Sequence, residues 1–191
     1  MKRLLMALLL VSIFAGNGFS QFGIGATGGG FYPGLMKDDK SGSRFEAGWG
    51  FGLFLRHSVE DVIDTLDITG RYAYRRYVNK IVLPNVLDTW FTFTYLNVDF
   101  LITLKRYDDF KIYTGIGAGL LTATADKDFL HFTDSQIIPE ILVGVEWQLG
   151  KSYNVFVESS MQFGSINGEN GESIPITGFR FIAGATMFLT E

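Results

Sequence analysis

The sequence predicts an all-β protein, an eight-stranded antiparallel up-and-down transmembrane β-barrel with a polar lumen and an apolar, lipid-facing exterior. Apolar and polar residues alternate with a period of two over segments of about 10–13 residues, which places successive side chains on opposite faces of a strand. The 191 residues include 23 glycines and 15% aromatic residues but only 4 prolines, a composition typical of β architectures. The mature chain contains no run of about 20 apolar residues that would predict a membrane-spanning helix.

Residues 1–20 have the pattern of a secretory signal peptide. Two basic residues precede an apolar run over residues 4–15, and small residues precede a cleavage site before Gln21. As a helix this run would span about 18 Å, too short for the ~30 Å hydrocarbon core, which argues against a membrane anchor. We therefore expect a barrel domain over residues 21–191 that leaves the cytoplasm.

The first three alternating segments cover residues 21–35, 45–56 and 66–77. The first is mostly glycine after two apolar residues and gives the weakest pattern. In the second, tryptophan, phenylalanine and leucine at odd positions oppose glycine and arginine. In the third, apolar and tyrosine residues oppose aspartate, threonine and arginine. Each pattern predicts a strand with one apolar face.

The remaining five segments cover residues 95–105, 110–122, 137–149, 153–163 and 178–189. The first two alternate aliphatic residues with polar residues or glycine. The third is the clearest, because all its odd positions are apolar and its even positions include two glutamates. The last two set apolar residues against polar residues and glycine. A helix would scatter these residues around its circumference, so strands are predicted throughout.

The connections between the segments alternate between short and long. Short turns at residues 106–109 and 150–152 contrast with long polar loops at residues 36–44, 80–89, 126–135 and 165–173. Residues 57–65 depart from this alternation, because a short turn is expected there. Their apolar spacing is also compatible with one amphipathic helical turn.

Three features favour an apolar exterior over the apolar interior of a soluble barrel. The segments exceed the ~5–6 residues of ordinary strands and match the ~9–11 that a tilted strand needs to cross a bilayer. Their polar faces combine glycine with charges of both signs, which suits a narrow, ion-paired lumen. Aromatic residues lie near the segment ends, as in interfacial girdles. One predicted rim contains Trp90 and Phe163, and the other Trp147, Tyr153 and Phe110.

The polar faces supply candidates for structural ion pairs in the lumen: Arg71, Arg75, Asp99, Lys105, Glu140, Glu146, Glu158 and Arg180. Hairpin geometry places Arg71 near Asn97 and Asp99. The same reasoning places Arg180 diagonally near Glu158. Side chains just fill the interior of an eight-stranded barrel, so no open aqueous channel is expected.

Motifs that would carry chemistry are weak. Residues 23–28 match the G-x-G-x-x-G dinucleotide fingerprint, but that mechanism needs a preceding strand and a following helix. Here the motif begins the mature chain, so a strand with small lumen residues is predicted. Glu140, Glu146 and Glu158 share the lumen with basic residues and are predicted to form ion pairs rather than an acid–base site. The absence of cysteine excludes disulfides, thiolate zinc sites and cysteine nucleophiles.

The two histidines also favour no catalytic or metal site. His57 and Ser58 are adjacent and would point to opposite faces of a strand, which argues against a lipid-deacylating pair. We expect His57 to be a solvated turn residue. His131 shares a loop with three aspartates, where a loose divalent-metal site is the alternative to solvated side chains; these are Asp126, Asp128 and Asp134. No catalytic, metal or cofactor residues are predicted.

The start of the mature chain, residues 95–101, residues 113–119 and the closing strand resemble the small outer-membrane β-barrel family related to OmpA-type and PorT-type barrels. The resemblance covers residues 21–191 and rests on strand pattern rather than on an invariant motif. It implies a location in the cell outer membrane, both termini in the periplasm, and insertion by the general barrel assembly machinery. Such barrels often end on an aromatic residue, whereas this chain ends Leu-Thr-Glu. No periplasmic domain follows, so peptidoglycan anchoring is not expected.

The leading functional hypothesis is a non-enzymatic structural or interaction barrel with a filled lumen. Its apolar exterior would contact outer-membrane lipid, and its long surface loops would contact surface molecules or an unidentified surface or periplasmic protein. The main alternative is a soluble lipocalin-like barrel that binds an apolar ligand inside. A small pore, a secretion-system-associated barrel and a lipid-modifying barrel enzyme are further alternatives. The net charge of −4 argues against nucleic-acid binding.

Overall fold

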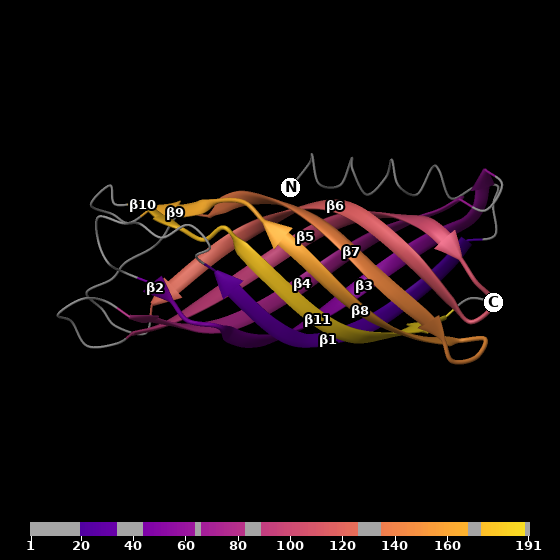
Figure 1. Cartoon of the computed structure of the whole chain (residues 1–191), viewed down its shortest axis with the longest axis horizontal. Helices are drawn as coiled ribbons and strands as arrows, with labels where there is room; N and C mark the ends of the chain where they lie inside the picture. Colours follow the sequence, from indigo (N-terminus) through magenta and orange to yellow (C-terminus); the bar gives the residue numbers. More distant parts are fainter. Residues whose placement is uncertain are drawn as a thin grey trace.

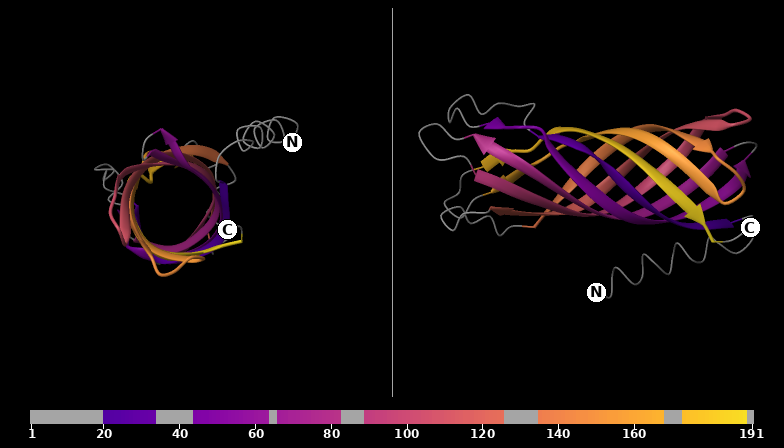
Figure 2. Two further views of the ribbon diagram at one scale, coloured as in Figure 1. Left: turned by 90° about the vertical axis from the view of Figure 1, so that its right-hand side faces the viewer. Right: turned by 90° about the horizontal axis from the view of Figure 1, so that it is seen from below.

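The computed structural model describes residues 20–33, 44–63, 66–82, 89–125, 135–167 and 173–189. In this part of the chain, eight long antiparallel strands close into a barrel, and Figure 2 shows the ring along its axis. Sequence neighbours pair throughout, and the first and last long strands pair to complete the ring. The predicted fold class is confirmed. The strands are β1 (Ser20–Pro33), β3 (Gly48–Ile63), β4 (Leu66–Val82), β5 (Thr89–Arg106), β6 (Phe110–Ala125), β7 (Gln136–Gln148), β8 (Tyr153–Gln162) and β11 (Gly178–Phe188).

The two ends of the barrel differ. At the termini end, where β1 begins and β11 finishes, the connections between strands are short. The opposite end, called the loop end here, carries the long connections and three short strands (Figure 1). Of these, β2 (Arg44–Phe45) extends the pairing of β4, while β9 (Ser165–Asn167) and β10 (Ser173–Pro175) form a hairpin.

The helical turn considered for residues 57–65 is wrong. Strand β3 continues to Ile63 and β4 begins at Leu66, so only two residues separate the strands. The pairing shifts register between Val59 and Ile63, and this irregularity breaks the sequence alternation without ending the strand. Most of the residues that the sequence pattern assigned to a long connection therefore belong to strand β3.

The exterior of the barrel is apolar and its centre is ionic. Ile141 and Val143 on β7 are 51% and 49% exposed, and the outward side chains of the other long strands are similarly apolar around the middle of the barrel. Arg71 and Asp99 face inward and are buried. A soluble barrel has the opposite distribution. The lipocalin-like alternative requires Ile141 and Val143 inside, and the structure contradicts it.

Exposed aromatic side chains lie around both rims of the apolar surface, as predicted for interfacial girdles. The loop-end girdle contains Tyr32, Trp49, Phe163 and Phe179. The termini-end girdle contains Phe22, Tyr107, Trp147 and Tyr153. Phe110 is half-buried because its ring stacks on Tyr107, with ring centroids 4.4 Å apart.

Candidate functional site

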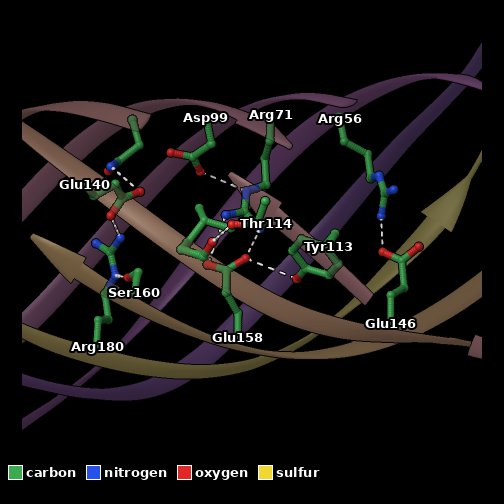
Figure 3. Close-up of polar contacts among 12 residues, drawn as sticks. Arg56, Arg71, Asp99, Tyr113, Thr114, Glu140, Glu146, Glu158, Ser160 and Arg180 are labelled. Carbon is green, nitrogen blue, oxygen red and sulfur yellow. Dashed lines mark hydrogen bonds and ion pairs between the residues drawn. The ribbon is translucent and has the colours of Figure 1, made fainter. Parts of the chain in front are cut away.

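The candidate site is the lumen, where three arginines and three carboxylates meet at mid-height (Figure 3). None of the six is more than 4% exposed; they are Arg71, Arg75, Asp99, Glu140, Glu158 and Arg180. Asp99 Oδ2 accepts hydrogen bonds from Arg71 Nε and Arg75 Nη2, each at 2.9 Å. This central cluster is electrically neutral, so each buried charge is compensated by an opposite charge.

Arg71 connects two walls of the barrel. Besides its bond to Asp99 on the neighbouring β5, its Nη1 and Nη2 donate to the two carboxylate oxygens of Glu158 at 2.8 and 3.0 Å. Tyr113 Oη donates to Glu158 Oε2 at 3.1 Å. This two-pronged contact is the strongest geometry for an arginine–carboxylate pair, and it joins β4 to β8 across the bore.

Glu140 on β7 binds side chains from three other strands, β4, β5 and β11. Its Oε1 accepts from Arg75 Nη1 at 3.1 Å and from Asn97 Nδ2 at 3.2 Å. Its Oε2 accepts from Arg180 Nη2, and Arg180 Nε donates to Ser160 Oγ at 3.1 Å. The expected pairing of Arg180 with Glu158 is therefore wrong. Strands in a tilted barrel are staggered, and this stagger brings Glu140, rather than the diagonal neighbour, within reach of Arg180.

A second ionic cluster fills the lumen toward the termini end. Glu146 pairs with Arg56, accepts from Asn154 Nδ2 at 2.7 Å and lies 3.2 Å from Lys111 Nζ. Lys111 Nζ also lies 3.8 Å from Asp67 Oδ2. The two clusters together place ionic side chains along the central and termini-side parts of the bore.

Lys105 does not belong to the lumen, contrary to prediction. A β-bulge between Thr103 and Lys105 adds one residue to β5 and turns Lys105 outward, where it is exposed. Its Nζ lies 4.8 Å from the centre of the Tyr107 ring. Arg106, whose side chain is 36% exposed at the end of the bore, pairs with the buried Asp67 instead. The alternation pattern gave no signal of this bulge.

This exchange of roles predicts different effects of two alanine substitutions. Lys105→Ala is expected to change the free energy of unfolding by less than about 0.5 kcal/mol, as for most surface substitutions. Arg106→Ala is expected to lower it by about 1–2 kcal/mol, because Asp67 loses a charged hydrogen-bond donor. Urea unfolding in detergent micelles measures both values. Equal effects would contradict the bulge geometry.

The lumen near the loop end is apolar. A buried cluster of mostly aromatic side chains fills it: Phe31, Tyr77, Phe91, Phe93, Tyr95, Leu121, Ala123, Ile138 and Ile176. Phe31 and Phe93 pack edge to face, with ring centroids 5.8 Å apart. Gln162 Nε2 donates to Tyr95 Oη at 3.0 Å and to the Ile176 carbonyl at 3.1 Å, which ties the residues after β10 to the barrel. The predicted polar lumen therefore does not extend to this layer, and smaller buried apolar groups, such as Phe54 with Phe156 and Leu101 with Leu142, also lie among the ionic side chains of the rest of the bore.

Glycine makes room for the ionic side chains. A Cβ atom at Gly119 would lie 2.8 Å from the Asn97 side-chain nitrogen, and one at Gly117 would collide with Asp99. Both glycines lie on β6 directly opposite these two residues of β5. Small residues on one strand thus accommodate the polar side chains of the next.

Two solved structures are similar to this barrel over most of its length. The crystal structure of neisserial surface protein A, NspA, matches with a TM-score of 0.56 and 15% sequence identity, covering 88% of this chain and 96% of that chain. The outer membrane protein OprG from Pseudomonas aeruginosa matches with a TM-score of 0.57 and 10% identity, covering 92% and 99%. No protein-family model matches the sequence, and no curated protein matches it.

The chain has the fold of an eight-stranded outer-membrane β-barrel. The apolar exterior between two aromatic girdles is the surface that such a fold presents to lipid. A closed barrel also pairs the backbone groups at the edges of its sheet, which a bilayer requires. Fold and surface together are those of a barrel that spans a lipid bilayer. No helix among the described residues is long and apolar enough to cross a membrane.

The other sequence motifs acquire structural roles or lie outside the described residues. Residues 23–28 lie within β1 and pair with strands on both sides, which leaves no helix to receive a pyrophosphate. His57 is wrongly predicted as a turn residue; it lies in β3 opposite Phe22 and Gly70 and is half-buried. Residues 1–19 of the expected signal peptide and the loop with His131, Asp126, Asp128 and Asp134 lie outside the described residues, whereas Ser20 begins β1. Among the residues described, no group of three metal-ligating side chains assembles.

Proposed function

We propose that the protein is an integral outer-membrane barrel with a structural or interaction role rather than a transporting or catalytic one. The observation that carries this proposal is the filled lumen. The aromatic layer at the loop end lies above the central ionic cluster, and side chains of both layers are buried. Eight-stranded barrels of this kind hold side chains where wider barrels hold water.

An interaction role would fall to the loop end, which carries the long connections and the short strands β2, β9 and β10. Asn79 Nδ2 donates to the carbonyls of Phe31 and Glu46 at 3.0 Å, and so ties this end to the barrel wall. A rigid barrel that presents anchored segments outside the membrane suits contact with surface molecules or a protein partner. Insertion by the general assembly machinery and a relation to OmpA-type and PorT-type barrels remain predictions.

We expect the refolded protein to show no steady conductance in planar lipid bilayers, because two layers of packed side chains obstruct the bore. A change in gel mobility on boiling would first establish that the barrel is folded. A wide porin reconstituted in the same lipid is the positive control. Steady single-channel current from the folded protein would contradict this proposal and favour the small-pore alternative.

A further inference from the structure

The outer face of β4, β5 and β6 changes character toward the loop end (at the left in Figure 1). On β5 Leu96 is the last outward aliphatic residue; Thr94 and Thr92 follow, and the exposed Trp90 lies beyond them at the beginning of the strand. On β6 they end at Leu120, and Thr122 and Thr124 follow. These strands contain 16–18 residues, whereas the opposite strands β8 and β11 contain 10 and 11. One side of the barrel thus extends beyond its apolar belt.

The inner face of this extension changes in the opposite sense. Phe91, Phe93, Leu121 and Ala123 point inward and are at most 1% exposed. Polar outside and apolar inside is the distribution of a sheet that lies in an aqueous or polar layer. With a rise of about 3.3 Å per residue and a tilt of about 40°, Thr92 lies roughly 10 Å above Leu96 along the barrel axis. This height corresponds to the headgroup layer that borders the hydrocarbon core.

Residues of different chemistry share this surface, called the threonine wall here: Arg76, Trp90, Thr92, Thr94, Thr122 and Thr124. Thr92 pairs directly with Thr124 and Thr94 with Thr122, so four hydroxyl side chains lie next to one another on two adjacent strands. Arg76 is exposed directly opposite Thr94, and it has no ion-pair partner among the described residues. Trp90 is 50% exposed at the beginning of β5.

We propose that the threonine wall binds the phosphorylated saccharide headgroup of an outer-leaflet glycolipid. A guanidinium at headgroup height binds phosphate through charge-assisted hydrogen bonds. Hydroxyl groups donate to and accept from sugar hydroxyls, and an exposed indole offers an apolar face beside a hydrogen-bond donor. This inference rests on the proposed location of the protein in an outer membrane.

The apolar surface below the wall supports this single kind of occupant. Tyr74 and Leu96, the residues two positions toward the membrane from Arg76 and Thr94, are 39% and 57% exposed on the lipid-facing belt. The acyl chains of a bound glycolipid would therefore continue directly from the wall onto that belt. A soluble sugar or an extramembrane protein would use only the upper part of this continuous surface.

The test is binding of lipid A, a phosphorylated diglucosamine glycolipid, to the full mature protein in detergent micelles. We expect Arg76→Ala to weaken binding roughly tenfold or more, the size expected for loss of a charge-assisted hydrogen bond. Trp90→Ala is expected to weaken it several-fold through loss of ring contact. Lys105→Ala removes an exposed positive charge at the opposite end and is the matched control, with unchanged affinity expected. Arg76→Lys would retain part of the affinity.

Two comparison lipids separate the sources of binding. Dephosphorylated lipid A is expected to bind the wild type weakly, and to bind Arg76→Ala with the same low affinity. Phosphatidylglycerol is also expected to bind both proteins weakly. Binding of phosphatidylglycerol as tight as that of lipid A, or an Arg76→Ala variant with wild-type affinity, would overturn the inference. Gel mobility before and after boiling checks that each variant is folded. Failure of the wild type in that assay would count against the proposed function itself.

Discussion

Replacing Glu140 with alanine is expected to lower the free energy of unfolding by roughly 3–5 kcal/mol, the usual cost of removing one partner of a buried ion pair. Among the described residues, Glu140 is the carboxylate that pairs with Arg180. It also accepts hydrogen bonds from Arg75 and Asn97. After the substitution Arg75 keeps Asp99, but Arg180 keeps only its bond to Ser160. A guanidinium 1% exposed then lacks a compensating negative charge.

Urea unfolding in lipid vesicles, followed by tryptophan fluorescence, measures this effect. Glu140→Gln is expected to cost less, because the amide oxygen still accepts hydrogen bonds. Glu46→Ala removes an exposed carboxylate at the loop end and is the control, with a change below about 0.5 kcal/mol. The double variant Glu140→Ala, Arg180→Met removes both charges and is expected to recover more than half of the loss. A Glu140→Ala effect as small as that of the control would contradict the buried network.

The barrel was predictable from sequence where a strand lies in the membrane, because lipid outside and packed polar groups inside force a strict alternation. Outside the membrane that constraint is relaxed or inverted. Strand β5 begins at Thr89 rather than at residue 95, and periodicity missed this part because its outward residues are Trp90, Thr92 and Thr94 whereas its inward residues are aromatic. Likewise β3 continues to Ile63 through a register shift near the termini end. The strand ends were therefore the part of the fold that periodicity missed.

The sequence was sufficient to predict which types of residue face the ionic lumen and from which side of each strand, but not which residues pair there. Arg71 lies beside Asp99 because the two residues are direct cross-strand neighbours, a relation that hairpin length determines. Contacts across the bore, such as Arg71 with Glu158, depend on the stagger of the closed barrel, which no single hairpin encodes. The displacement of Lys105 depends on a one-residue bulge, which leaves no mark in the alternation.

The aromatic layer at the loop end was missed although the sequence carries a signal for it. Phe91 and Phe93 are in phase with Asn97 and Asp99 on β5, so an inward position for one pair implies an inward position for the other. Treating aromatic residues near segment ends as lipid-facing hid this signal, because parity rather than residue type decides which face a side chain occupies. Tyr113, by contrast, was expected on the lumen face, because it is in phase with Gly115 on β6, and it is buried there.

Arginine substitutions at two outward positions are expected to differ by several kilocalories per mole according to their height on the barrel. Ile141→Arg places a charge in the apolar belt, where Ile141 pairs with Ile116 and Met161, and is expected to cost about 2–4 kcal/mol. Thr124→Arg places the same charge on the exposed threonine wall and is expected to cost less than about 0.5 kcal/mol. The free energy of unfolding in lipid vesicles measures both.

The paired comparison separates the two surfaces, because the introduced side chain is the same and both positions face outward. Val143→Arg, two residues further along β7 on the same face, is expected to repeat the large effect, since Val143 is 49% exposed within the belt. A Thr124→Arg variant as unstable as Ile141→Arg would place the wall inside the hydrocarbon layer. An Ile141→Arg variant of wild-type stability would instead contradict a lipid environment around the middle of the barrel. The burial of Arg71, Asp99 and Glu140 in the bore would then have no explanation.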